Sequence, residues 1–455
     1  MESICGFEFF RLVFDSDGVL QSKGSLEQVI QRANTVNATD AIFIAHGFRN
    51  SEDDATDLYT KFLCSFRQHV DGLFHDTLGA RRFVVAGVYW PSKAFKEVEE
   101  LTGSVQSVGD DTEEKQAVRV ALLEMKHELA EEDEKDKLDR AMELLDSVKD
   151  SRDSQDEFVR QVLWLIPNPS ADPMEGADRI CSTPGSELLD KLAIPIKLPT
   201  RRSPQSGDEG GTEGLEDMNI GDVDSGDTQG LVTTAFGSIY GRIGQFLNLT
   251  TWYVMKDRSG TVGGNGVSAA VRDLHAARPS TRVHLVGHSL GGRLMAACSK
   301  SLAQDAKESR VRPDSLTLLE AAFSHYGFSN DNGNGEPGFF RAVIDNSIVK
   351  GPLMETFSVK DTVVGKVYAI ASRLAGDNVK AIGDANDPYG GIGRNGAQKT
   401  AEAVFDNLTA PGTVPRQFTI GKVTCLDGSD NLINNHSDIT NATVTFAFAS
   451  AVKQT

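Results

Sequence analysis

The stretch RVHLVGHSLGGR, residues 282–293, decides the fold of this chain. Val283, Leu285 and Val286 predict a short buried strand. After the pentapeptide GHSLG, apolar residues return at helical spacing and predict a helix. Strand, G-x-S-x-G and helix in this order predict a nucleophile elbow, with Ser289 at its tip.

The chemistry explains why glycines flank the serine. A Cβ atom at Gly287 or Gly291 would collide with the neighbouring strand or helix, so the tight turn requires glycine there. The turn would hold Ser289 in a strained conformation with Oγ exposed, and the following helix would direct N–H groups and its positive dipole end at a developing oxyanion. A chance G-x-S-x-G is the alternative, but the flanking strand and helix favour a serine nucleophile.

Outside this stretch, apolar runs alternate with amphipathic segments. Buried strands are expected at 7–14, 41–45, 83–90, 315–319, 355–359 and 418–426, and helices at 26–33, from the N-cap Ser51 onward, and at 236–255, 267–277 and 442–452. Strands that alternate with helices predict an α/β fold with a mainly parallel central sheet covered by helices.

A charged insertion interrupts this pattern. From 93 to about 156 apolar residues recur at helical spacing, which predicts helices arranged as an antiparallel pair broken near 131–137. Residues 201–230 are rich in Gly, Ser, Asp and Glu, so we expect an acidic disordered or mobile segment. The predicted organisation is a first core part at 1–92, a helical insertion or cap at 93–230, and a second core part at 231–455.

Composition excludes several classes of function. The net charge of −19 argues against nucleic acid as a partner, and no apolar run is long enough to span a bilayer. The N-terminus lacks the pattern of a secretory signal, and the 5 scattered cysteines suit reduced thiols, so a cytoplasmic protein is expected. No metal or cofactor is expected, because there is no CxxC and the glycine-rich run at 390–393 lacks the context of a phosphate loop.

A serine nucleophile needs a base and an acid, and their order along the chain narrows the choice. Of 9 histidines only His325 and His436 follow Ser289. His436 lies in a polar loop after the last predicted strand, where the base is required, whereas His325 would line the pocket. A solvated loop histidine is the alternative for His436.

Asp361 is the predicted acid, because it follows the strand predicted at 355–359. The alternative role for Asp361 is that of a helix N-cap. Glu320 and Asp331 would suit an earlier acid position, and Asp438 is too close to His436 in sequence to approach Nδ1 from the usual direction.

Two backbone N–H groups are the expected oxyanion donors. His46-Gly47-Phe48 follows the strand expected beside the nucleophile strand, so the N–H of Phe48 would act together with that of Leu290. An ordinary turn is the alternative, and His46 is expected to be structural.

The segments AIFIAHGFRNSEDDA, FVVAGVYWPS, RVHLVGHSLGGR, FSVKD and NNHSDI together resemble the α/β-hydrolase superfamily, and most closely its lipase- and esterase-like members with a GHSLGG elbow and an HGF oxyanion loop. The resemblance covers most of the chain outside 93–230. It implies Ser289 as nucleophile, Asp361 as acid, His436 as base, and Phe48 and Leu290 as oxyanion donors. The early, charged insertion departs from a compact esterase.

Three functions follow as hypotheses. The first is a serine hydrolase that cleaves small-molecule or lipid carboxylic esters through an acyl-enzyme, with the insertion as a cap over Ser289. The second uses the same triad on an amide or peptide bond, and nothing in the sequence separates these two. The third is a non-catalytic protein with a vestigial elbow, whose helical insertion binds a protein partner.

Overall fold

The computed structural model describes residues 2–21, 23–92, 111–132, 134–194, 196, 198, 238–376, 382–412 and 414–455. The predicted mobile segment 201–230 lies outside these residues. The chain divides into two compact units. We call Met1–Ser92, Arg258–Val364 and Gly391–Thr455 the sheet unit, and Lys93–Asp257 with Gly365–Gly390 the helical unit.

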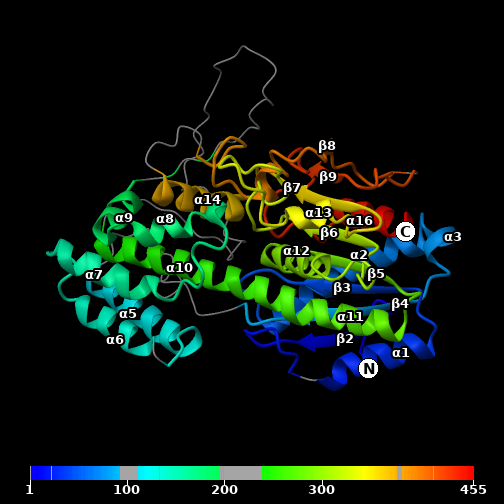
Figure 1. Ribbon diagram of the computed structural model, residues 1–455, viewed down its shortest axis with the longest axis horizontal. Helices are drawn as coiled ribbons and strands as arrows, with labels where there is room; N and C mark the ends of the chain where they lie inside the picture. The colour runs from blue at the N-terminus through cyan, green and yellow to red at the C-terminus, as the bar shows by residue number, and fades with distance from the viewer. Residues whose placement is uncertain are drawn as a thin grey trace, which may run out of the picture. The chain divides into compact units, whose positions relative to one another are not determined.

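A mostly parallel sheet forms the centre of the sheet unit (Figure 1). In the described residues it has 9 strands in the order β1-β2-β4-β3-β5-β6-β7-β9-β8, and only the β1–β2 pair is antiparallel. The strands are β1 (Glu2–Ile4), β2 (Phe7–Val13), β3 (Asp40–Ala45), β4 (Phe83–Tyr89), β5 (Arg282–His288), β6 (Ser315–Leu319), β7 (Leu353–Phe357), β8 (Ala403–Asn407) and β9 (Val423–Asp427). The predicted α/β class with a mainly parallel sheet is confirmed.

Helices cover both faces of this sheet (Figure 1). On one face lie α2 (Glu52–Asp71), α3 (His75–Leu78) and α16 (Ala442–Lys453). On the other lie α1 (Lys23–Thr35), α11 (Ser268–Ala277) and α12 (Leu290–Ala303), with the π-helical turn η2 (Val262–Val267) against α12. Two short helices, α13 (Arg341–Asp345) and α15 (Ile392–Asn395), complete the unit.

Local sequence explains why α2 begins where it does. Ser51 accepts a hydrogen bond from the backbone N–H of Asp54, and the Asp54 carboxylate accepts one from the Ser51 N–H, which confirms the predicted N-cap. Phe62 and Phe66 then face the core, where their rings lie 5.2 and 5.0 Å from that of Phe448 on α16. Aromatic packing of this kind holds α2 and α16 on the same face of the sheet.

Two expectations fail at the edges of the sheet. Strands β1 and β8 were not predicted: β1 is a 3-residue strand, and β8 is an edge strand with mostly exposed or half-buried side chains. The expectation that every cysteine is reduced is wrong for Cys5 and Cys64, which form a disulfide with a Cα–Cα distance of 5.2 Å. The turn between β1 and β2 places Cys5 against α2, a tertiary proximity that the scattered cysteine positions do not reveal.

The helical unit contains the helices predicted for the insertion. They are α5 (Asp111–Glu128), α6 (Lys135–Leu144), α7 (Arg152–Leu163), α8 (Ala177–Ser182) and α9 (Gly185–Leu192), with the 3₁₀ turn η1 (Pro173–Glu175), most of α10 (Ile239–Thr261) and most of α14 (Thr362–Ala375). The predicted break near 131–137 lies between α5 and α6. In the part of the chain that the structure describes, no helix has the length and apolar content needed to cross a bilayer.

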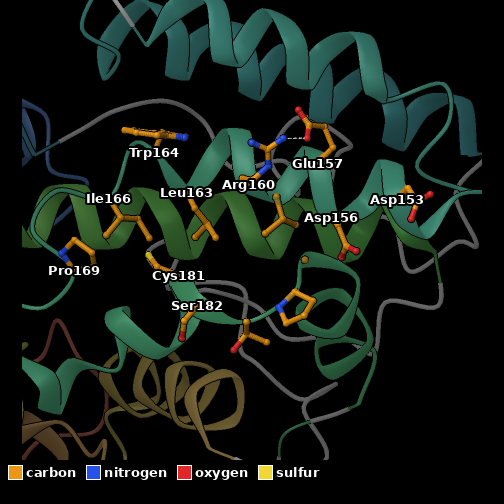
Figure 2. A pocket seen from close by; sticks show the side chains of 14 residues that line it. Asp153, Asp156, Glu157, Arg160, Leu163, Trp164, Ile166, Pro169, Cys181 and Ser182 are labelled. Atoms are coloured by element: carbon orange, nitrogen blue, oxygen red, sulfur yellow. Dashed lines mark hydrogen bonds and ion pairs between the residues drawn. The ribbon is translucent and has the colours of Figure 1, made fainter.

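A groove of about 680 Å³ lies between α7 and the segment 181–185 (Figure 2). Its lining combines apolar side chains such as Leu163, Trp164 and Ile166 with the carboxylates of Asp153, Asp156 and Glu157. All its lining residues belong to the helical unit, so it contains none of the residues predicted to carry chemistry.

Candidate active site

Ser289, Asp361 and His436 all follow strands of the same sheet. Ser289 joins β5 to α12, Asp361 lies between β7 and α14, and His436 lies between β9 and α16. These strands are parallel, so their carboxyl ends meet at one edge of the sheet, which is where α/β proteins bind ligands. Topology therefore brings the three residues to the same edge.

Ser289 has φ 56° and ψ −125°, a conformation that a residue with a side chain rarely adopts. Glycines make room for it, as predicted. A Cβ at Gly287 would collide with the carbonyl oxygen of Gly291, and a Cβ at Gly291 would collide with the carbonyl oxygens of Ala45 and His46. The turn therefore depends on both glycines.

Backbone hydrogen bonds hold Ser289 in this conformation. Its N–H donates to the Leu319 carbonyl at 3.0 Å, and its own carbonyl accepts from the N–H groups of Gly292 at 2.9 Å and Ala322 at 3.0 Å. Strained residues persist where surrounding contacts over-determine them, and such residues cluster at functional sites.

Asp361 and His436 are in direct contact. His436 Nδ1 lies 2.8 Å from Asp361 Oδ2, and both residues are buried. Because a carboxylate only accepts, Nδ1 carries the hydrogen, and a neutral His436 then has its lone pair on Nε2. The other oxygen, Asp361 Oδ1, accepts from the backbone N–H of Val364 at 2.9 Å. The contact with Asp361 therefore fixes the orientation of the His436 ring.

His288, the residue before Ser289, is in direct contact with His436. The Nε2 of His288 lies 2.8 Å from the His436 carbonyl oxygen, and the two imidazole rings are 4.6 Å apart. Burial, followed by the nearby His436, lowers the pKa of His288 well below its usual value, so the ring is neutral and Nε2–H is the donor. Among the described residues Ser289 Oγ makes no hydrogen bond to His436. Such bonds are often long without substrate and tighten when it binds.

The loop at 46–48 lies directly against the serine. Its strand, β3, pairs with β5, with Ala45 opposite Gly287. A Cβ on Gly47 would be 2.8 Å from the Cβ of Ser289 and 3.3 Å from its Oγ, so only glycine permits this approach. Within the described ranges neither the N–H of Phe48 nor that of Leu290 donates a hydrogen bond to another residue. Both predicted oxyanion donors are thus available to a ligand.

His46 is a structural residue beneath this loop. Its Nδ1 is 3.0 Å from the Gly47 carbonyl oxygen, and the backbone N–H of Trp90 donates to its Nε2 at 3.4 Å. One nitrogen must donate and the other must accept, which only the neutral ring can do. Burial lowers the pKa of His46 to about 4.

The alternative acids lie elsewhere or play other parts. Asp331 binds the N–H groups of Gly333 and Gly335 in its own loop, and Asp438 accepts from the Asn441 side chain. Glu320 is buried beside Asp361 and does not contact His436 in the described structure. Asp361 is therefore the carboxylate that orients His436.

Arg394, which no sequence motif marks, supports the loop that carries Asp361. Arg394, on α15, donates from Nη1 to the carbonyl oxygens of Val359 and Asp361, and so fixes the loop that carries the carboxylate. The sequence of its segment predicts only a turn-rich loop. Within the described residues no cluster of His, Cys, Asp or Glu has the arrangement of a metal site.

Comparison of the chain with models of known protein families, with curated proteins and with solved structures finds no match.

Proposed function

We propose that this chain is a serine hydrolase with an α/β-hydrolase fold that cleaves carboxylic esters, with Ser289 as nucleophile, His436 as base and Asp361 as acid. The observation that carries the proposal is the 2.8 Å contact between His436 and Asp361 at the sheet edge where Ser289 has φ 56°. A serine held in such a turn and an imidazole held by a carboxylate are the two parts that acyl transfer requires.

The steps follow from these positions. His436 Nε2 takes the proton of Ser289 Oγ as the oxygen attacks the ester carbonyl, and Asp361 stabilises the imidazolium that forms. The N–H groups of Phe48 and Leu290 stabilise the oxyanion. The intermediate collapses to an acyl-enzyme as His436 protonates the departing alcohol. Water, activated by the same ring, then releases the acid and restores Ser289.

Small-molecule and lipid esters both suit the triad, and a cap role for the helical insertion stays a prediction. The cytoplasmic location also stays a prediction, and the Cys5–Cys64 disulfide counts against it because disulfides persist mainly in oxidising compartments.

A fluorophosphonate probe tests the mechanism, since it labels an activated serine and ignores an inert one. We expect labelling of the wild type and none of Ser289→Ala, which keeps the fold because alanine tolerates the same backbone conformation as serine. Ser299→Ala is the matched control, because Ser299 lies on α12 and in the described structure its Oγ donates to the Met295 carbonyl within the same helix. A panel of p-nitrophenyl esters of rising chain length, run beside a peptide library, then separates esterase from amidase. Full hydrolysis by a folded Ser289→Ala protein would rule out the serine mechanism.

A further inference from the structure

Glu320 is the first residue after β6, and both its backbone and its side chain are held unfavourably. Its φ of 44° lies in the left-handed region, which favours glycine. Its side chain is fully buried, and within the described residues neither carboxyl oxygen makes a hydrogen bond of good geometry, although the Thr356 hydroxyl lies nearby. Buried polar groups without partners are rare in native proteins and call for an explanation.

The groups around Glu320 come from three other elements. The carboxylates of Asp361, in the loop before α14, and of Glu355, on β7, face it together with the guanidinium of Arg394 on α15. Burial, followed by the charge of Asp361, raises the pKa of Glu320 well above its usual value. A second carboxylate in a buried site disfavours the charged form of the first, so this neighbourhood favours a proton on Glu320.

The hydrogen bonds decide which carboxyl holds that proton. Asp361 accepts from His436 Nδ1 at 2.8 Å and from the Val364 N–H at 2.9 Å, and both donors favour its ionised form. Near Glu320 the Thr356 hydroxyl favours the ionised form, but this effect is smaller than those of burial and of Asp361, which favour the protonated form. The proton therefore belongs on Glu320, where it also supplies the hydrogen bond that this carboxyl lacks.

We infer that Glu320 is a neutral acid that donates its O–H to the Asp361 carboxylate, and that it is a positioning residue for the acid that orients His436. The inference rests on the proposed function. Each carboxylate oxygen has two lone pairs, so Asp361 can accept a third hydrogen bond. An O–H···O⁻ bond between buried groups is among the strong ones, and it would fix the rotation of Asp361 toward His436.

Two variants of the same position separate a hydrogen-bond role from a packing role. Glu320→Gln keeps the shape and offers an N–H donor to Asp361, whereas Glu320→Met fills similar space and offers none. Both carry a Cβ, so they bear the same backbone cost at the positive φ. We expect kcat of Glu320→Met to fall about tenfold or more with little change in KM, because a bond to a charged group is lost. Glu320→Gln should recover most of that loss.

Spectroscopy of the whole protein gives readouts that do not need turnover. At neutral pH infrared difference spectra should show the C=O band of one protonated buried carboxyl in the wild type, and this band should be absent in Glu320→Gln. Proton NMR should show the His436 Nδ1–H resonance, which should move in Glu320→Met and return toward the wild-type position in Glu320→Gln. Circular dichroism confirms that each variant is folded.

The outcomes distinguish failure of this inference from failure of the proposed function. If fluorophosphonate labels Ser289 but the carboxyl band is missing, Glu320 is ionised and the inference is wrong. If the band is present but Glu320→Met leaves both kcat and the His436 resonance unchanged, Glu320 does not act on Asp361, and the inference is again wrong. If Ser289 is never labelled, the proposed function fails, and the band with the His436 resonance still decides whether Glu320 donates to Asp361.

Discussion

His46 should make the stability of the sheet unit depend on pH. The ring is 1% exposed, and both of its nitrogens are occupied, Nδ1 by the Gly47 carbonyl and Nε2 by the Trp90 N–H. A second proton would remove the acceptor that Trp90 uses and would place a charge in the core. Burial accordingly lowers the pKa of His46 from its usual 6.5 to about 4.

The sign and size of the effect follow from this difference. Between pH 6.5 and about pH 4 the unfolded chain binds a proton at His46 and the folded chain does not. The stabilisation is therefore fully present above pH 6.5 and is lost as the pH falls toward 4. Each pKa unit corresponds to about 1.4 kcal/mol, so the free energy of unfolding should decrease by about 3 kcal/mol from this group alone.

Denaturant unfolding of the wild type and of His46→Gln, measured from about pH 7 to about pH 4, isolates this contribution. Other groups titrate in both proteins and cancel in the difference. We expect the stability advantage of the wild type over His46→Gln to shrink by about 3 kcal/mol across this range. His75→Gln, which removes an exposed histidine of the same unit, is the matched control for the loss of a titratable ring.

Two results would refute the reasoning. The first is a difference between wild type and His46→Gln that stays constant with pH. The second is an NMR titration in which the His46 ring of the folded protein takes up its proton near its ordinary pKa of 6.5. Either would mean that the folded state accommodates the charge, and that the two hydrogen bonds do not fix the neutral ring.

Two further predictions concern the acid and the disulfide. Asp361→Asn should be folded, because asparagine also caps helices, but its kcat should fall by about four orders of magnitude. If the variant turns over an ester at nearly the wild-type rate, the acid is another residue. Cys64→Ala should lose about 4 kcal/mol of unfolding free energy, because the disulfide closes a loop with a sequence separation of 59. If the wild type and the variant are equally stable without reductant, or if mass spectrometry finds a free Cys5 thiol in the wild type, the disulfide does not form.

Elements with strong local signals could be predicted from the sequence. The strand and helix around Ser289 and the cap of α2 at Ser51 depend on residues within a few positions of each other, so their patterns are visible in the chain. Edge strands carry weaker signals. In β8 most side chains are exposed or half-buried, so there is no continuous apolar run to mark it.

The contacts that are distant in sequence could not be predicted. The Cys5–Cys64 disulfide depends on how a turn meets a helix, and the chain holds 5 cysteines with several pairings open. Arg394 and Glu320 contact the loop that carries Asp361 only because β6, β7 and α15 converge at one edge of the sheet. No spacing rule connects these residues, so their roles become apparent only in three dimensions.

Asp361 shows why two competing predictions can describe one residue. A triad acid and a helix N-cap are alternatives in the sequence, yet the two carboxylate oxygens leave room for both roles: Oδ2 accepts from His436, and Oδ1 accepts from the N–H of Val364 in the first turn of α14. The cap restrains rotation of the carboxyl group, and the positive end of the helix dipole favours its negative charge. In the proposed mechanism both effects would help Asp361 to stabilise the imidazolium of His436. The position of Asp361 at a helix start therefore orients its carboxylate through the backbone, which leaves the second oxygen to bind His436.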